Sequence, residues 1–247
     1  MHRVLLEICT DGIASVQAAL DGGADRIELC SSLPLGGLTP GIGLVEASLS
    51  LFGPQVMVMI RPRGGDFFYS DAEFEVMKRE VRAVKAAGAA GVVLGLLLKD
   101  GQIDLMRTQQ LVALARPLSV TFHRAFDQVP DPEKALEALI LAGADRVLTS
   151  GLAPDALSGS AMIARLQQQA AGRIAILAGA GILPENVAQL VRDTNIRECH
   201  ASAKISREGQ MAYRRPGEVY GWQESHADTV RQIRKQLDEL ELGHFMA

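Results

Sequence analysis

Short apolar, β-branched runs alternate with longer amphipathic stretches along the whole chain, and this alternation constrains the fold more than any other feature. The runs predict strands at residues 4–9, 26–30, 56–60, 91–94, 119–123, 146–150, 174–178 and 197–200. Helical periodicity fills the intervals near 12–21, 43–52, 72–87, 104–115, 132–142, 155–171 and 184–192, and a last amphipathic stretch covers 225–242. Such alternation, with nearly continuous apolar strands, predicts a parallel sheet with both faces covered.

The number of these units fits a closed barrel. Eight strand–helix units in 247 residues are the usual size of a (β/α)₈ barrel. Similar segments at 22–29, 87–94 and 142–149 support repeated units, and no shift in composition marks a second domain. We therefore predict an α/β fold, a single-domain TIM barrel over residues 1–247. The alternative is an open doubly wound sheet, whose first turn often carries Gly-x-Gly-x-x-Gly, where this chain has Thr10-Asp11-Gly12.

Charge and cysteine content exclude several classes of protein. A net charge of −4, a pI near 5.8 and the lack of a long Lys/Arg run argue against a nucleic-acid partner. No run of 18 apolar residues predicts a membrane span, and Glu7 interrupts the apolar start, so we expect no signal peptide. Cys9, Cys30 and Cys199 are far apart and odd in number, which predicts reduced thiols and a cytoplasmic protein.

Ionisable residues gather where the predicted strands end. In TIM barrels the active site lies at the carboxyl ends of the strands, and alternate side chains point into the barrel. If the faces that carry these residues point inward, the mouth of the barrel collects Glu7, Glu28, Arg61, Arg63, His123, His200, Cys9 and Cys30. Charged residues are seldom buried without partners, so this concentration needs an explanation.

Two explanations of the charged cluster stay open. In the first, the planar guanidinium groups of Arg61 and Arg63 clamp a carboxylate or phosphate. His123 would then act as acid or base, with Glu7 or Glu28 as its partner. In the second, the two glutamates pair with the two arginines, and this self-satisfied ion network only fills the barrel.

A glycine-rich turn, Ala178-Gly179-Ala180-Gly181, follows the seventh predicted strand. TIM barrels frequently bind phosphate with the loops after strands seven and eight. Gly179 and Gly181 would let backbone N–H groups face an anion, and Ser202 and Lys204 would add a hydroxyl group and a charge. The same glycines also suit an ordinary turn between a strand and a helix.

Cys9 and Cys30 end neighbouring predicted strands at equivalent heights. Two thiolates in this position suit a soft ion such as Cu(I). No Cys-x-x-Cys or Met-x-x-Met motif accompanies them, so two inert buried thiols are an equally good interpretation of the spacing. Cys199 has the opposite parity to His200 and is predicted to face the helices.

Several motifs carry a family resemblance. They are Gly-Gly-Ala-Asp-Arg-Ile-Glu-Leu-Cys (22–30), Gly-Gly-Leu-Thr-Pro (36–40), Met-Ile-Arg-Pro-Arg-Gly-Gly-Asp-Phe (59–67), Thr-Phe-His-Arg-Ala-Phe-Asp (121–127) and Glu-Cys-His-Ala-Ser (198–202). In these motifs, over about residues 3–205, the chain resembles the CutC family, long called copper homeostasis proteins. The resemblance implies a cytoplasmic TIM barrel and a homodimer or larger assembly. It also implies Cu(I) binding by cysteines that end the first two strands, which are Cys9 and Cys30 here.

Three functions therefore stay open. The first is copper homeostasis through Cu(I) binding. The second is a TIM-barrel enzyme, isomerase-like or lyase-like, that acts on a small phosphorylated or carboxylated metabolite, and the third is a structural barrel. The candidate catalytic residues are Glu7, Glu28, Arg61, Arg63, His123, Asp127 and His200. The expected partner is a copper ion or a small anionic ligand, with no nucleic acid and no membrane.

Overall fold

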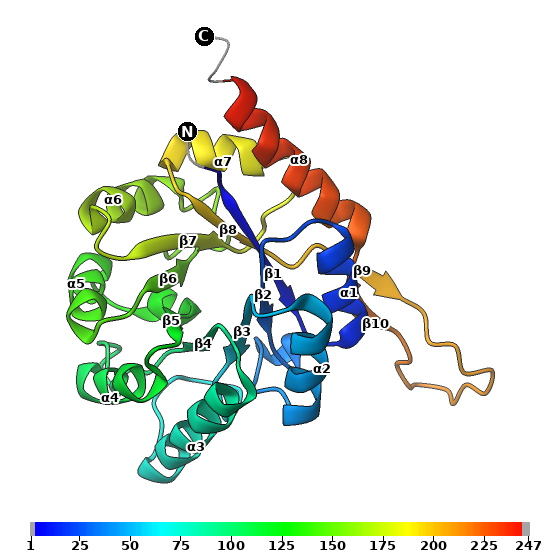
Figure 1. The fold of residues 1–247 in the computed structure, drawn as a ribbon, viewed down its shortest axis with the longest axis horizontal. Coiled ribbons are helices and arrows are strands. Elements are labelled where there is room, and N and C mark those ends of the chain that lie inside the picture. Colours follow the sequence, from blue (N-terminus) through cyan, green and yellow to red (C-terminus); the bar gives the residue numbers. More distant parts are fainter. Residues whose placement is uncertain (1–2, 244–247) are drawn as a thin grey trace.

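Eight parallel strands close into a barrel in chain order (Figure 1). The computed structural model describes residues 3–243. The strands are β1 (Leu5–Thr10), β2 (Arg26–Leu29), β3 (Val56–Met59), β4 (Gly91–Leu94), β5 (Ser119–Phe122), β6 (Arg146–Thr149), β7 (Ala175–Gly179) and β8 (Glu198–Ala201). The barrel closes between β1 and β8, where Glu7 is in register with His200. The predicted TIM barrel is thereby confirmed, and the open doubly wound sheet is wrong.

Helices surround the barrel, as the periodicity predicts. They are α1 (Ile13–Asp21), α2 (Ile42–Phe52), α3 (Asp71–Ala87), α4 (Leu105–Ala115), α5 (Pro132–Ala142), α6 (Ser160–Ala170), α7 (Val187–Thr194) and α8 (Ala227–Gly243), with short 3₁₀ helices η1 (Leu33–Leu35) and η2 (Arg124–Gln128). The capping box of Ser70 and Glu73 begins α3, and Gly88 ends it in the left-handed conformation. Helix α6 starts later than predicted because Asp155 accepts a hydrogen bond from the Ser158 N–H group and holds a turn there.

The strands separate two kinds of packing. Their outward side chains, among them Leu6, Ile8, Val58 and Val92, are fully buried against the helices in the main core. Burial of each such side chain stabilises the fold by about 1.5–3 kcal/mol. Inward side chains on or just after β1, β2, β3 and β4 form a second, smaller cluster of Cys9, Cys30, Met57, Met59 and Val93. Alternation along β1 and β2 thus points the two predicted thiols into the barrel, whereas Cys199 is buried in the main core.

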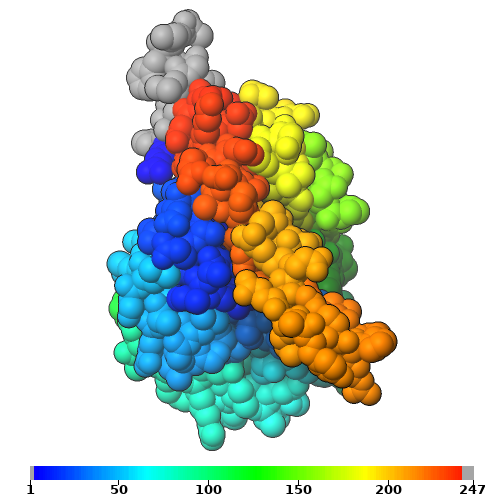
Figure 2. All heavy atoms as spheres, turned by 90° about the vertical axis from the view of Figure 1, so that its right-hand side faces the viewer, coloured from blue at the N-terminus to red at the C-terminus, as the bar shows by residue number. Residues whose placement is uncertain are grey.

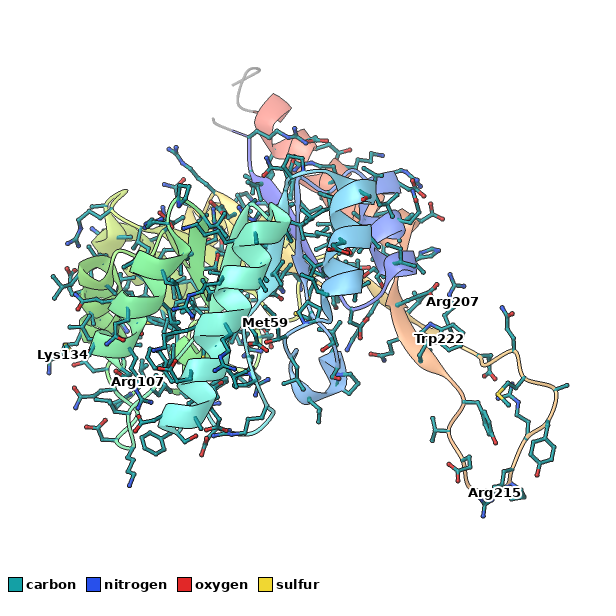
Figure 3. The ribbon with its side chains drawn as sticks, turned by 60° about the horizontal axis from the view of Figure 1, so that its bottom comes forward. Met59, Arg107, Lys134, Arg207, Arg215 and Trp222 are labelled. Atoms are coloured by element: carbon teal, nitrogen blue, oxygen red, sulfur yellow. The ribbon has the colours of Figure 1, made fainter. Side chains whose placement is uncertain are left out.

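Residues 201–224, for which the sequence pattern predicts no strand or helix, contain most of an antiparallel hairpin. Strands β9 (Lys204–Arg207) and β10 (Trp222–Ser225) pair, and Arg207 Nε lies 2.6 Å from Glu224 Oε1 across the ribbon. The segment 208–221 between them projects from the barrel as an arm, with Arg215 far from the strands (Figure 3). Figure 2 shows the hairpin, in orange, beside the blue N-terminal part of the chain, and β10 contacts both α1 and β1.

The predicted C-terminal helix is present as α8, which lies alongside α1 and α7. Val230, Ile233 and Leu237 form its buried face. No helix among residues 3–243 is both long enough and apolar enough to cross a bilayer.

Candidate functional site

An ion network fills the barrel interior near the amino-terminal ends of β2, β6 and β8. Arg26 donates from Nε to Glu7 Oε2, and its Nη2 lies 2.6 Å from Glu198 Oε2. Arg146 Nε approaches the same Glu198 oxygen at 2.6 Å and its Nη1 donates to Thr121 Oγ1 at 3.2 Å. Each of these charges has a partner of opposite sign, as a buried ion pair requires. The predicted network of Glu7 and Glu28 with Arg61 and Arg63 is therefore wrong in its members. The buried network joins Glu7 and Glu198 to Arg26 and Arg146.

Arg61 and Arg63 do not contact the glutamates of the barrel. The buried Arg61 donates to the carbonyl oxygens of Leu35, Gly37 and Gly65 at 2.8, 3.0 and 2.9 Å. It therefore ties the loops after β2 and β3 together. The prediction that it pairs with Glu7 or Glu28 is wrong.

Arg63 points to the surface instead of the barrel mouth. Its Nε lies 2.6 Å from Glu73 Oε1 and its Nη2 lies 3.0 Å from Asp66 Oδ1. Because β3 ends at Met59, alternation no longer determines where side chains point at this position. Its guanidinium group is used within its own loop, and the structure gives no anion clamp formed with Arg61.

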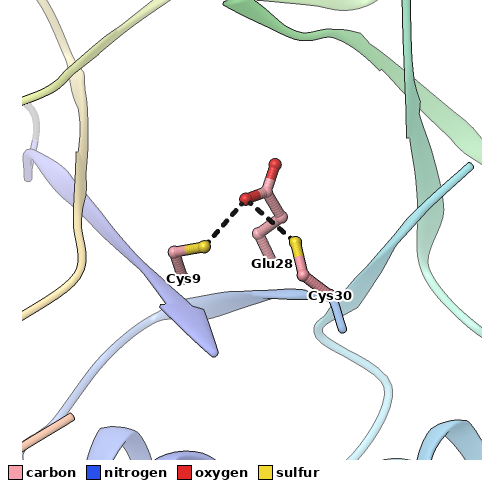
Figure 4. Close-up of side chains that lie close together, drawn as sticks. All are labelled: Cys9, Glu28 and Cys30. Atoms are coloured by element: carbon pink, nitrogen blue, oxygen red, sulfur yellow. Dashed lines mark hydrogen bonds between the residues drawn. The ribbon is translucent and has the colours of Figure 1, made fainter. Parts of the chain in front are cut away.

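Cys9, Glu28 and Cys30 form a thiol–carboxylate cluster inside the barrel (Figure 4). Cys9 Sγ donates to Glu28 Oε2 at 3.1 Å, and Cys30 Sγ donates to the same oxygen at 3.6 Å. One ligand atom from each of the three buried residues lies within 4.8 Å of the other two. The second carboxylate oxygen, Oε1 of Glu28, is buried and has no hydrogen-bond partner among the described residues. These three side chains, which we call the Cys9–Glu28–Cys30 cluster, have the composition of a small metal site.

His200 lies between two carboxylates. Its Nδ1 is 2.7 Å from Glu7 Oε1, and its Nε2 is 3.7 Å from Glu28 Oε2. Burial alone would lower the pKa of His200, but Glu28 and Glu7 raise it well above its ordinary value. Burial alone would raise the pKa of Glu7, but Arg26 and His200 lower it to about 2. The pair is therefore an imidazolium and a carboxylate at neutral pH.

Both thiols of the cluster hold their protons at neutral pH. The pKa of Cys9 lies well above the ordinary thiol value because of its hydrogen bond with Cys30 and, second, because of its burial. For Cys30 the contact with Cys9 acts in the lowering direction, but burial and Glu28 raise its pKa to about 12. A metal that binds here must displace these protons, because thiolates are the metal ligands.

His123 makes no hydrogen bond or ion pair with Glu7 or Glu28, its predicted partners. It is buried, its Nδ1 accepts the Ala125 N–H group at 3.1 Å, and its ring packs on Phe67 at 5.0 Å between centroids. Burial and then the charge of Arg61 lower the pKa of His123 to about 3. It is neutral at physiological pH, and His200 is the charged histidine of the barrel mouth.

Asp127 organises the loop after β6. It accepts hydrogen bonds from Thr149 Oγ1 at 2.5 Å and from the Ser150 backbone N–H at 3.0 Å. It also pairs with Arg124 Nε at 2.7 Å, and Arg124 Nη2 donates to Ser150 Oγ at 3.1 Å. Asp127 is therefore a positioning residue for Arg124. Arg124 is not among the residues predicted for the site, although it stands between His123 and Asp127 in the motif 121–127.

A cavity of about 1120 Å³ opens at the carboxyl ends of β1, β7 and β8, with the hairpin as one wall. Cys9 and His200 line its floor. Three of the four residues predicted to hold an anion also line it: Gly181, Ser202 and Lys204. The fourth, Gly179, serves packing instead, because a Cβ atom there would lie 2.6 Å from Leu148 Cδ1 and 3.3 Å from the His200 ring.

Backbone strain concentrates at this end of the barrel. Among the described residues, six that are not glycine have positive φ. Four follow strands: Ser32 (52°), Leu152 (62°), Ala180 (83°) and Ala203 (47°); the other two, Ala171 and Asn195, end α6 and α7. Each such conformation costs about 1–3 kcal/mol and persists only where surrounding contacts hold it. Strain of this kind tends to collect at functional sites, which favours the mouth as the working end.

Comparison with known proteins places the chain. The family model described as the CutC family matches residues 4–205. The chain belongs to the CutC family. A CutC family protein of Chromobacterium violaceum is 46% identical over 243 residues, which cover 95% of this chain and 98% of that protein. A human protein named copper homeostasis protein cutC homolog is 48% identical over 217 residues, covering 88% of this chain and 80% of that one.

A solved CutC structure has the same fold. The crystal structure of the Streptococcus agalactiae CutC protein superposes with a TM-score of 0.77 at 30% identity, covering 81% of this chain and 98% of that chain. The family span of 4–205 contains the Cys9–Glu28–Cys30 cluster and the ion network. Most of the hairpin and all of α8 follow that span, so one wall of the mouth cavity lies outside the residues that the family model matches.

Proposed function

We propose that this CutC family protein binds Cu(I) through Cys9 and Cys30, with Glu28 as the neighbouring carboxylate, and that it acts in copper homeostasis. The observation that carries the proposal is the set of three buried ligand atoms within 4.8 Å of one another. Sulfur donors are soft ligands and suit Cu(I) better than a hard ion such as Mg²⁺. The name of the human relative, which refers to copper homeostasis, is consistent with this assignment.

The residues around the cluster fit a bound monovalent cation. Both thiols already donate hydrogen bonds to Glu28 Oε2, so this carboxylate is in position to receive a proton as a thiol becomes a ligand. Glu28 Oε1 has no hydrogen-bond partner among the described residues and stays available as a further oxygen donor. The positive charge of His200, 3.7 Å from Glu28 Oε2, offsets part of the negative charge that two thiolates would bring.

The test is an anaerobic Cu(I) titration of the reduced protein against a competing chelator. Cys9→Ser and Cys30→Ser each remove one sulfur ligand but retain a donor to Glu28, so the fold should survive. Cys199→Ala is the matched control, because Cys199 is buried in the main core, away from the cluster. We expect tight binding in the wild type and the control, and a loss of at least tenfold in each serine variant. Equal affinity in all four proteins would refute the proposal.

We further infer a reducing, cytoplasmic setting and a homodimer or larger assembly. All three cysteines are free thiols, as expected in a reducing compartment. The arm at 208–221 exposes Met211, Tyr213 and Val219, which supply apolar surface for a second copy of the chain. Light scattering coupled to gel filtration tests the assembly, and a monomer at all concentrations would contradict it.

A further inference from the structure

The cavity at the barrel mouth is much larger than a metal ion requires. Its volume of about 1120 Å³ is that of a site for an organic molecule. It reaches from the floor formed by Cys9 and His200 to the hairpin wall formed by Trp222 and Gln223. Copper binding at the Cys9–Glu28–Cys30 cluster uses only the floor, so the rest of the cavity has no role in the proposed copper function.

Two cations in the lining face this space without a full set of partners. Lys204 is exposed and makes no ion pair or side-chain hydrogen bond with any described residue. Arg124 is held through Nε and Nη2 by Asp127 and Ser150, which leaves Nη1 without a partner in the described chain. An arginine fixed in this way is preorganised to bind a carboxylate or phosphate.

The turn after β7 adds backbone donors. The N–H groups of Gly181 and Ile182 make no hydrogen bond to described residues, and both residues line the cavity. Gly181 has a φ of 67°, and a Cβ atom there would lie 2.9 Å from Asp155 Cβ, so the turn requires glycine. These donors lie on the same cavity wall that carries the strained residue Ala180.

The lining also contains groups that suit hydroxyl donors. Asp11, Ser202 and Glu208 line the cavity together with the cations. Carboxylates repel an anionic group but accept hydrogen bonds from hydroxyl groups. A ligand that satisfies the whole lining therefore combines one negative group with several hydroxyl groups.

We propose that the mouth cavity binds a small polyhydroxylated organic anion, a sugar phosphate or a sugar acid, whose charged group is held by Arg124 and Lys204. The hydroxylated part would lie against Asp11, Ser202 and Glu208, above the floor of Cys9 and His200. The two cations of this site lie outside the Cys9–Glu28–Cys30 cluster, and the cavity meets that cluster at Cys9 in its floor.

The proposal is tested by calorimetric titration of the full-length, metal-free, reduced protein. The probes are ribose 5-phosphate, gluconate and uncharged ribose, so that the first two distinguish phosphate from carboxylate and the third measures the need for charge. We expect one or both anions to bind at least tenfold more tightly than ribose. Lys204→Gln and Arg124→Gln should each weaken anion binding at least fivefold.

The controls separate charge from folding and from copper. Lys235→Gln makes the same change as Lys204→Gln on an exposed side chain of α8, outside the cavity lining, and should bind as the wild type does. Arg124→Lys should recover part of the affinity that Arg124→Gln loses. Cys30→Ser should keep anion binding while it loses Cu(I), because Cys30 belongs to the Cys9–Glu28–Cys30 cluster but does not line the cavity. No binding of either anion, or equal binding in Lys204→Gln and Lys235→Gln, would overturn the proposal.

Discussion

Nδ1 of His200 lies 2.7 Å from Oε1 of Glu7, across the pair of strands that closes the barrel. The contact joins the eighth strand to the first and brings the charge of His200 to the edge of the Cys9–Glu28–Cys30 cluster. Glu7 thus contacts Arg26 of the ion network and also His200, whose Nε2 faces Glu28 of the cluster. One carboxylate holds the structural network and the candidate site together.

Replacement of Glu7 by glutamine should destabilise the protein strongly. Arg26 and His200 would lose the carboxylate between them, and breaking a buried ion pair costs about 3–5 kcal/mol. Glu137→Gln is the matched control, since Glu137 pairs with Arg173 at the exposed surface and should change little. Urea denaturation measures both. Similar midpoints for the two variants would show that the barrel network does not support the fold.

Arg61→Lys should also reduce stability, by about 2 kcal/mol or more, because a lysine cannot reach three carbonyl oxygens in a fixed fork. Arg63→Lys makes the same change on a side chain that is 38% exposed and should have a smaller effect. Limited proteolysis should find the loop at 32–40 cleaved faster in Arg61→Lys. If Arg61→Lys keeps full stability but loses binding of ribose 5-phosphate, the result would support the prediction that Arg61 clamps an anion.

His123 should make the fold sensitive to acid. Its pKa in the folded protein is about 3, whereas the unfolded value is near 6.5. The unfolded state therefore takes up a proton first, so stability is present above pH 6.5 and is lost as the pH falls towards 3. The loss attributable to His123 between pH 7 and pH 5 is about 2 kcal/mol. Urea denaturation of His123→Asn, which keeps an acceptor for Ala125, should show a pH dependence flatter by this amount; parallel curves would contradict it.

Asp127→Asn should affect the mouth cavity without affecting copper. The loop after β6 and the orientation of Arg124 both depend on this carboxylate. We expect gluconate or ribose 5-phosphate to bind several-fold more weakly, and Cu(I) affinity to stay unchanged because Asp127 lies outside the Cys9–Glu28–Cys30 cluster. Parallel titrations of both ligands decide this, and an equal loss for both would point to general damage to the barrel.

Much of the fold followed from local pattern. The alternation of apolar runs and helical periods predicted all the strands of the barrel, and alternation within β1, β2 and β8 correctly pointed Glu7, Cys9 and His200 into its interior. These predictions succeed because the two-residue period of a strand is fixed by its backbone geometry.

The wrong predictions and the contacts that were not predicted have separate causes. Arg61 and Arg63 follow β3, in a loop where the strand period does not apply, and their long side chains reach other partners. The partners of Glu7 and Glu198 were missed because Arg26 and Arg146 lie at the opposite, amino-terminal ends of β2 and β6, where no ligand site was expected. The hairpin was missed because β9 and β10 are short and lack a buried apolar face.

Because the barrel closes between residues 7 and 200, its strands become available in a fixed order while the chain is synthesised. Cys9 and Cys30 lie on the first two strands, so they can come together as soon as those strands pair, while His200 and β8 have yet to be synthesised. At about 5–20 residues per second, roughly 10–35 s of translation separates these two events. During that interval neither β8 nor His200 covers the thiol pair, whereas in the closed barrel Cys9 faces the mouth cavity.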